Sequence, residues 1–410
     1  MHLRSDPVGA NVWFWTAKEQ LGREGLMVKE LNRRGFLSTL VATTACKLAA
    51  SVLPASFLQE KDSQTWARYD QAVIIDSLGT PGSSSASDIL VALSSSEIED
   101  IRKSGLTAVN LTVSGVGSYA RDYEQTIRTV AYWDAQISAH PEVLLHVLET
   151  ADIHEAKRSH RLGLIYGFQD ATPFAEDLDR LDIFRNLGVR IFQLTYNRRN
   201  LVGDGCLEPG NAGLSKFGRQ LIERLNATGS LVDLSHAGER TTLEAIEASV
   251  KPVAITHTAC AVLAPNPRNK TDVELRKLAS KGGYVGIYFM PFLRSEGQPM
   301  AIDLVSHIEH AINVCGEDHV GLGTDGYITP VAVTPEYKKA FAEEVSKRRQ
   351  LGISAPGEDP DVYTFIPDLN SSDHFNKVAV LLSQRRHSDA QIEKILGSNF
   401  ERVLSEAWRT

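Results

Sequence analysis

Eight short apolar runs, separated by longer amphipathic segments, restrict the fold of this chain more than any other feature. The runs lie at residues 72–78, 107–113, 162–168, 189–196, 230–236, 252–258, 283–289 and 319–325. Each is rich in valine, isoleucine or aromatic residues, and continuous apolar character indicates a strand buried on both faces, as in a parallel sheet. The intervening segments have helical spacing, and several end on glycine, as helix C-termini tend to do.

Eight strands alternating with helices predict a (β/α)8 TIM-type barrel, a fold of the α/β class. A doubly wound open sheet is the alternative, but no G-x-G-x-x-G follows the first strand, so a dinucleotide site has no support. We expect residues 57–410 to form a single catalytic barrel domain with a long insertion at about 327–372. Such an insertion is a place for a lid or for a homodimer contact.

The N-terminal part of the chain has the pattern of an export signal. Residues 31–45 read LNRRGFLSTLVATTA, and adjacent arginines before a short apolar run resemble a twin-arginine signal. We therefore expect residues 1–56 to comprise an extension and this signal. Export signals normally begin a chain, which makes Met27 a candidate for the true start. The protein is then expected to use the twin-arginine export machinery and to reach the bacterial periplasm or exterior.

Composition excludes some classes of partner. The net charge is −8, and no basic stripe indicates a nucleic acid. No apolar run reaches the roughly 20 residues of a membrane span, so we expect none in the mature chain. Three cysteines, at positions 206, 260 and 315, follow the signal. Their scattered spacing matches neither a disulfide framework nor a zinc knuckle.

Polar residues stand at the ends of three predicted strands. His236 ends the run 230–236, His257 lies near the end of the next run, and Asp325 ends the run 319–325. Catalytic residues of such barrels lie at the carboxyl ends of the strands, and neighbouring strands are about 4.8 Å apart. We therefore expect the two imidazoles to share one metal. Asp325 could equally cap a helix, but beside a histidine pair we favour a base that activates water.

Several segments resemble one known family. They are SLVDLSHAGERT, PVAITHTACAVLAPNPRNKTD, KGGYVGIYF, HVGLGTDG and ILGSNFERVL, in this order. From about residue 70 to 405 the chain resembles the membrane (renal) dipeptidase family of zinc peptidases, which have amidohydrolase-type barrels. The resemblance implies a dipeptidase with two zinc ions bridged by a glutamate. His236 and His257 match histidine ligands, Arg268 matches the arginine that holds the substrate carboxylate, and Asp325 matches the aspartate beside the metal-bound water.

Other positions depart from the family pattern. Leu78 and Thr80 stand where the family has the H-x-D pair of the first strand, and neither is a useful zinc ligand. Gln169 stands in place of the bridging glutamate, and an amide oxygen cannot bridge two zinc ions as a carboxylate does. Tyr196 replaces the histidine that contacts substrate, and its hydroxyl can donate to an oxyanion.

The loop after the fourth predicted strand contains three candidates for replacement ligands, Asp204, Cys206 and Glu208, and Asp170, directly after Gln169, is a fourth. A turn with incidental acids is the simpler interpretation of this loop. Either way, we expect one zinc ion or fewer per chain.

These observations predict an exported, metal-dependent hydrolase that cleaves dipeptides or peptide-like amides. Asp325 and Tyr196 are the expected catalytic residues, His236 and His257 the metal ligands, and Arg268 and Gln169 the substrate contacts. Two alternatives are a tailoring enzyme for an exported secondary metabolite and a non-catalytic barrel that binds a peptide.

The export signal can be tested by changing both Arg33 and Arg34 to lysine. The twin-arginine route requires the arginine pair, so the double variant is expected to stay in the cytoplasm as an unprocessed precursor. Cell fractionation and the mass of the product measure this. Normal appearance of the variant in the periplasm would contradict the prediction.

Overall fold

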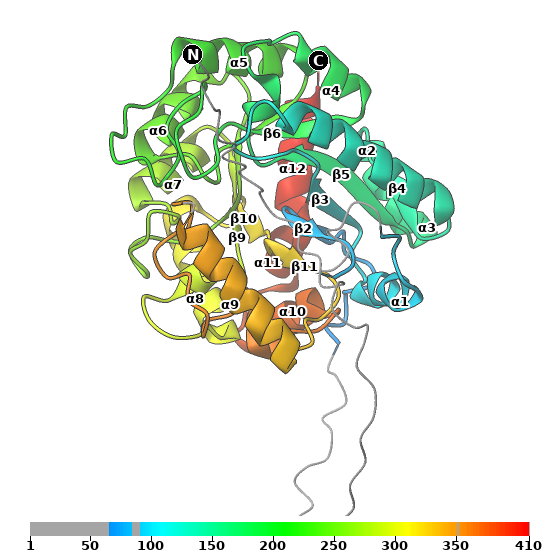
Figure 1. The fold of residues 1–410 in the computed structure, drawn as a ribbon. Coiled ribbons are helices and arrows are strands. Elements are labelled where there is room, and N and C mark those ends of the chain that lie inside the picture. The colour runs from blue at the N-terminus through cyan, green and yellow to red at the C-terminus, as the bar shows by residue number, and fades with distance from the viewer. Residues whose placement is uncertain (1–64, 84–90, 351, 410) are drawn as a thin grey trace, which may run out of the picture. The chain divides into compact units, whose positions relative to one another are not determined.

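A computed structural model describes residues 65–83, 91–350 and 352–409 of the chain, so the predicted export signal lies outside the described residues. Within them, eight parallel strands pair side by side in chain order and form the predicted α/β barrel (Figure 1). These strands are β1 (Ile75–Asp76), β3 (Ala108–Thr112), β5 (Leu162–Phe168), β6 (Val189–Gln193), β7 (Leu231–Asp233), β8 (Ala254–Thr258), β9 (Tyr284–Ile287) and β10 (Val320–Leu322). Each lies within one of the eight apolar runs, which confirms the predicted fold.

Ser77 closes the barrel between its last and first strands. Its backbone N–H donates to Leu322 O at 3.0 Å. Its hydroxyl lies 2.7 Å from the same oxygen and 2.6 Å from Thr256 O. Ser77 thus joins the last strand of the barrel to the first, and its N–H and hydroxyl are both hydrogen-bonded.

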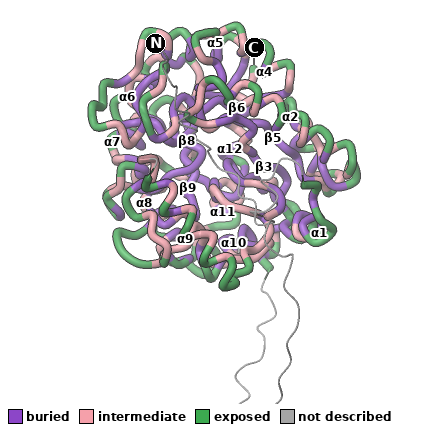
Figure 2. The backbone as a smooth tube through the Cα atoms, viewed as in Figure 1, coloured by how far each residue is buried: buried purple, intermediate pink, exposed green. Residues whose placement is uncertain are grey.

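Helices surround the strands, and their outer faces are exposed while the strands are buried (Figure 2). They are α1 (Ser95–Ser104), α2 (Asp122–Ala139), α3 (Thr150–Ser159), α4 (Arg180–Asn186), α5 (Lys216–Ala227), α6 (Glu239–Ala248), α7 (Asp272–Ser280), α8 (Ala301–Cys315), α9 (Pro335–Gln350), α10 (His374–Gln384), α11 (Asp389–Glu393) and α12 (Asn399–Trp408). Capping boxes begin α1 at Ser94 and α7 at Thr271. No helix among the described residues is long and apolar enough to cross a membrane.

Three short strands were not predicted from the apolar runs. β2 (Gly79–Thr80) pairs with β11 (Gly326–Tyr327) beside the barrel, and β4 (Leu144–His146) pairs with β5. None of the three lies within one of the eight apolar runs, so the strand pattern did not indicate them. The β2–β11 pair places Thr80 opposite Tyr327.

Helix α12 closes the N-terminal end of the barrel. Its residues Phe400, Val403 and Leu404 pack in one buried cluster with the first residues of several strands, including Ile75 and Leu231. Because this end is filled by apolar side chains, the opposite end, where the strands finish, is left for polar chemistry.

Two buried aspartates fix the ends of neighbouring strands. Asp233 accepts hydrogen bonds from the backbone N–H and the hydroxyl of both Ser235 and Thr256, which joins β7 to β8. Asp76 accepts from the N–H groups of Leu78 and Thr324 and from the Thr324 hydroxyl, which joins β1 to β10. Burial raises the pKa of Asp76 to about 7, and these bonds oppose that shift. These bonds hold in place the residues that follow β1, β7 and β10.

The segment after β10 lies over the same end of the barrel. It contains α9 and a return loop, and its backbone carbonyls accept hydrogen bonds from the barrel loops. Arg198 Nε donates to Gly352 O at 2.9 Å, and Asn266 Nδ2 donates to Pro356 O at 2.6 Å. The predicted insertion therefore packs against the loops at the carboxyl ends of the strands.

Candidate functional site

The residues predicted to carry chemistry lie at the carboxyl ends of the barrel strands. Gln169 follows β5 directly, while Tyr196, His236 and Asp325 each lie three residues beyond a strand end. His257 is inside β8, and Arg268 follows in the next loop. Gln169, Tyr196 and Asp325 are partly exposed, whereas both histidines and the arginine are buried.

His236 and His257 face each other, as the adjacent strand ends predicted. Their Nε2 atoms are 2.9 Å apart, and their ring centroids are 5.0 Å apart. Burial, followed by the charge of Arg268, lowers the pKa of both imidazoles well below the usual range. Both rings are therefore neutral at physiological pH.

The neighbours of His236 determine which of its nitrogens carries hydrogen. Its Nδ1 lies 2.7 Å from Asn197 Oδ1. The Asn197 amide is oriented by its Nδ2, which donates to Ile353 O at 3.1 Å, so its oxygen faces the imidazole. An amide oxygen only accepts, so His236 Nδ1 is the donor and its Nε2 has a free lone pair.

His257 has the same tautomer for a similar reason. Its Nδ1 lies 2.9 Å from Thr256 Oγ1, and the hydrogen of that hydroxyl is already donated to Asp233 Oδ2 at 2.6 Å. His257 Nδ1 must therefore donate to Thr256. Two Nε2 lone pairs then point at each other and repel unless a proton or a metal ion lies between them.

The two histidines can supply two of the ligands of one metal ion. Metal-binding histidines usually donate their second N–H to a neighbouring acceptor, and both rings do so here. A two-metal centre does not fit. Leu78 is buried and apolar, Thr80 is neutral, and no group of three or more potential His, Cys, Asp or Glu ligands occurs within the described residues.

The four candidates for replacement ligands have other partners. Asp170 accepts from Asn200 and from the N–H of Gly117, and Asp204 pairs with Arg199. The remaining two sit in the same loop: Glu208 accepts from the N–H of Arg199 at 3.4 Å, and Cys206 Sγ donates to Asn197 Oδ1 at 3.4 Å. The structure does not assemble any of them with the histidine pair into a three-ligand group.

Arg268 is a buried cation with an open donor. Its side chain is 2% exposed, and Nη1 donates to Ser235 O at 2.6 Å. Its Nη2 is buried and has no hydrogen-bond partner among the described residues. A buried, unpaired guanidinium N–H is costly, and a carboxylate of a ligand would satisfy it.

Asp325 occupies an unusual backbone conformation near this arginine. Its φ is 54°, in the left-handed region that few residues other than glycine adopt, and its N–H donates to Leu78 O at 2.8 Å. Burial raises the pKa of Asp325 to about 6, while the charge of Arg268 and a hydrogen bond from Gln169 oppose the shift. The carboxylate is therefore ionised at neutral pH and can accept a proton.

Tyr196 covers the face of the His236 ring, with centroids 4.3 Å apart and planes inclined by 22°. Burial raises the pKa of its phenol, which keeps the hydroxyl protonated. The charge of Arg348 in the insertion, which is paired with Glu358, opposes this rise in the pKa. Pattern reasoning missed Arg348 and Asn197, because neither stands at a strand end within a recognisable motif.

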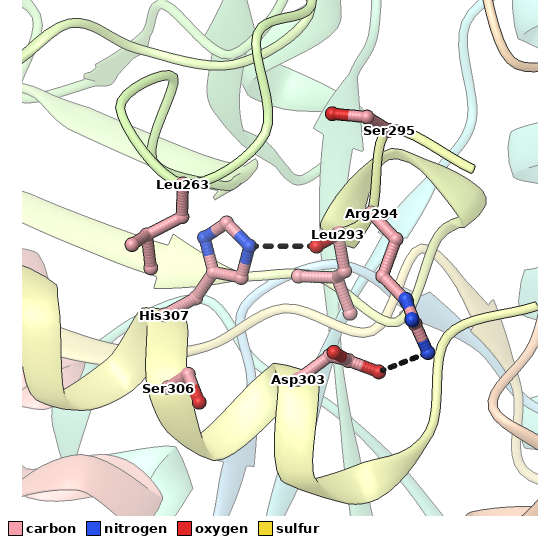
Figure 3. A pocket seen from close by; sticks show the side chains of 7 residues that line it. All are labelled: Leu263, Leu293, Arg294, Ser295, Asp303, Ser306 and His307. Atoms are coloured by element: carbon pink, nitrogen blue, oxygen red, sulfur yellow. Dashed lines mark hydrogen bonds and ion pairs between the residues drawn. The ribbon is translucent and has the colours of Figure 1, made fainter. Parts of the chain in front are cut away.

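A surface hollow of about 220 Å³ lies between α8 and the loops that follow β8 and β9 (Figure 3). Its histidine, His307, uses both ring nitrogens in structural bonds: Cys260 N–H donates to Nδ1, and Nε2 donates to Leu293 O. Arg294 faces Asp303 at 3.7 Å. The polar groups here serve packing, so the strand ends remain the candidate site.

Comparisons with known proteins show which family the chain resembles. The sequence model of the membrane dipeptidase family, peptidase family M19, matches residues 102–336. A dipeptidase of Claviceps purpurea, tcpJ, is 31% identical over 62% of this chain, which spans 53% of that protein's length. The chain thus spans about half of this relative.

Solved structures show the same fold. An amidohydrolase from Pseudomonas aeruginosa is 31% identical, has a TM-score of 0.69 and covers 83% of this chain and 98% of its own. A metallopeptidase from Rhodobacter sphaeroides, solved with a phosphinate mimic of a dipeptide, has a TM-score of 0.67. It is 16% identical, covers 82% of this chain and 99% of its own, and shows the fold alone.

The ligand set predicts one metal ion or fewer per chain, because only two imidazole nitrogens converge. Elemental analysis of the purified protein measures the count. The change His257→Ala is expected to abolish binding, whereas His154→Ala, on the exposed face of α3, is expected to leave it unchanged. Two stoichiometric metals per chain would contradict this ligand assignment.

Proposed function

We propose that this chain, which belongs to the membrane dipeptidase family (peptidase family M19), hydrolyses the amide bond of a dipeptide or a peptide-like amide. The observation that carries the proposal is the arrangement of Arg268 and Asp325. Arg268 is a buried guanidinium with an open N–H, and its charge opposes the rise in the pKa of the partly exposed Asp325 carboxylate. One group suits a substrate carboxylate and the other suits proton removal.

Arg268 would hold the C-terminal carboxylate of the substrate. The guanidinium presents several N–H donors in a planar fork, and Nη1 is already held by Ser235 O. Nη2 is therefore held in a fixed place and free to donate. Binding there satisfies a donor that is unpaired in the free protein, which favours ligands with a free carboxylate over amidated ones.

Asp325 would take the proton of the attacking water. A general base works best when its pKa lies near the working pH, and a value of about 6 meets this condition. The Asp325 N–H donates to Leu78 O, which holds the backbone that carries the carboxylate in place.

Tyr196 would donate its hydroxyl hydrogen to the oxyanion of the tetrahedral intermediate. Its ring is held against His236, so the hydroxyl has a defined position. A metal ion, when bound by His236 and His257, supplies Lewis-acid polarisation of an oxygen at this site. We also propose that the protein is exported, which rests on the arginine pair at positions 33 and 34.

A second candidate function is peptide binding without cleavage. The observation that favours it is the replacement of two expected metal ligands by Leu78 and Thr80, and of the bridging glutamate by Gln169. Arg268 would then still hold a carboxylate, but Asp325 would have no reaction to support.

The change Asp325→Asn separates the two functions. An amide cannot accept the proton, so turnover of dipeptides is expected to fall by about 100- to 10,000-fold while metal content is unchanged. Wild-type kcat/KM is expected to fall about tenfold per pH unit below about pH 6, because the base must be ionised. Binding of a dipeptide without cleavage, unchanged in Asp325→Asn, would instead support the binding protein.

The change Arg268→Ala tests recognition of the carboxylate. Loss of the charged donor is expected to weaken binding of dipeptides roughly 10- to 1,000-fold. Calorimetric titration measures the dissociation constants. The same dipeptides with an amidated C-terminus serve as a control, and they should bind wild type and variant similarly. Equal loss for both ligands would show that Arg268 does not contact the carboxylate.

A further inference from the structure

The turn that carries His236 is held by other parts of the chain. It spans residues 235–237, beyond the end of β7, and each of its three carbonyl oxygens accepts a hydrogen bond from outside the turn. Two of the donors are side chains of the loop after β8. The bonds run from Arg268 Nη1 to Ser235 O at 2.6 Å, from the Cys206 N–H to His236 O at 2.7 Å, and from Lys270 Nζ to Ala237 O. The backbone on both sides of the imidazole is therefore fixed.

Lys270 is the donor that the proposed function does not use. Its side chain is 2% exposed. An ammonium has three donors and no acceptor, and two hydrogen bonds and one ion pair occupy all three here. The partners are Ala237 O, Thr242 Oγ1 at 2.8 Å and Glu274 Oε1 at 3.4 Å. Because Thr242 lies in α6 and Glu274 in α7, this one side chain ties the turn to both helices.

The loop after β8 gives Lys270 and Arg268 a fixed base. The Lys270 N–H donates to Ala259 O, and the Ala261 N–H donates to Lys270 O, both at 2.9 Å. Thr258 Oγ1 donates to Arg268 O at 2.9 Å. The end of the loop is thus bonded back to the end of β8, so both side chains reach the turn from a backbone that is itself held.

The two histidines of the site differ in what holds them. His257 lies inside β8, and its N–H donates to Ser235 Oγ at 3.1 Å. His236 lies three residues beyond the end of β7, so its position depends on the bonds to its own turn. A rotation of that turn would separate the two Nε2 atoms, which lie 2.9 Å apart, and would draw His236 Nδ1 away from Asn197.

A buried ion pair is a costly way to hold a turn. Lys270 and Glu274 are each 2% exposed. The desolvation of two charges offsets most of their attraction, so replacing such a pair by neutral side chains often leaves stability unchanged. The contribution of this pair is therefore to geometry, since an ammonium with three partners fixes their relative positions.

We propose that Lys270 is a positioning residue for His236, which holds the turn 235–237 so that the imidazole faces His257. It acts through Ala237 O and is not itself a metal ligand. The inference rests on the proposed function for its purpose, because an oriented histidine pair serves a metal-dependent reaction. Arg268 holds the neighbouring carbonyl but is also assigned to the substrate, so Lys270 is the residue that isolates positioning.

The double variant Lys270→Met/Glu274→Gln tests this role. Methionine keeps the length of the side chain without its donors, and the second change leaves no buried carboxylate unpaired. Glutamine still accepts from Thr271, so the capping box of α7 is retained. The denaturant midpoint of unfolding is expected to stay close to that of wild type.

NMR of the ¹⁵N-labelled histidine side chains in metal-free protein reports the orientation of each ring. In wild type both rings are expected in the Nδ1–H form, because Asn197 and Thr256 accept those hydrogens. In the double variant His236 is expected to populate both tautomers and to exchange its Nδ1–H with water roughly 2- to 10-fold faster, the effect of weakening one hydrogen bond. His257 should keep its signals, because β8 holds it. The variant His236→Gln assigns the His236 signals.

The affinity for Zn²⁺ alone, determined by competition with a chelator, is the second measurement. Loss of a group that orients a metal-binding histidine typically weakens metal binding roughly 10- to 100-fold, and the double variant is expected to lie in this range. Lys277→Met/Glu247→Gln is the matched control, since it removes an exposed ion pair between the same two helices. It should leave the NMR signals and the Zn²⁺ affinity unchanged.

Thr242→Val covers the case in which the double variant does not fold. It removes one acceptor of Lys270 and keeps the ion pair, so it should disturb the His236 signals in the same direction by a smaller amount. Unchanged His236 signals in a folded variant, equal disturbance of His236 and His257, or the same loss in the matched control would overturn the role of Lys270. A wild type that binds no Zn²⁺ and hydrolyses no dipeptide would overturn the proposed function, whereas the NMR comparison would still decide the role of Lys270.

Discussion

The buried carboxylate of Asp233 is the group on which the rest of the site depends. It accepts four hydrogen bonds from Ser235 and Thr256, so β7 and β8 end at a fixed height relative to each other. Because the Thr256 hydroxyl donates its hydrogen to Asp233, Thr256 Oγ1 acts as the acceptor for His257. Asp233 also holds Ser235, whose carbonyl oxygen accepts a hydrogen bond from Arg268. Burying an ionised carboxylate is costly, and four donors compensate that cost.

The mouth of the barrel departs from the ligand pattern of the family that the sequence resembles. Leu78, Thr80 and Gln169 remove the means of holding a second ion, while Tyr196 stands beside the remaining histidine pair. In the insertion, Arg348 and Glu358 form a buried ion pair. In the proposed reaction the Tyr196 hydroxyl would be the donor that stabilises an oxyanion.

Much of the fold and part of the site could be predicted from the chain alone. The eight apolar runs each contain a barrel strand, since burial on both faces leaves a continuous signal in sequence. His236, His257 and Asp325 follow from the same reasoning, because strand ends of a barrel share one rim. The short strands β2, β4 and β11 lie outside these runs and left no such signal.

The sequence by itself determined the barrel, its rim residues and the absence of the usual ligands at Leu78, Thr80 and Gln169. Only the tertiary structure decided which ring nitrogen of His236 and of His257 carries the hydrogen, and which residues bond to them. Asn197 and Ile353 are 156 positions apart, yet their hydrogen bond joins the loop after β6 to the insertion, and the same amide accepts from His236. Such contacts depend on where a long insertion packs, and local periodicity carries no information on that packing.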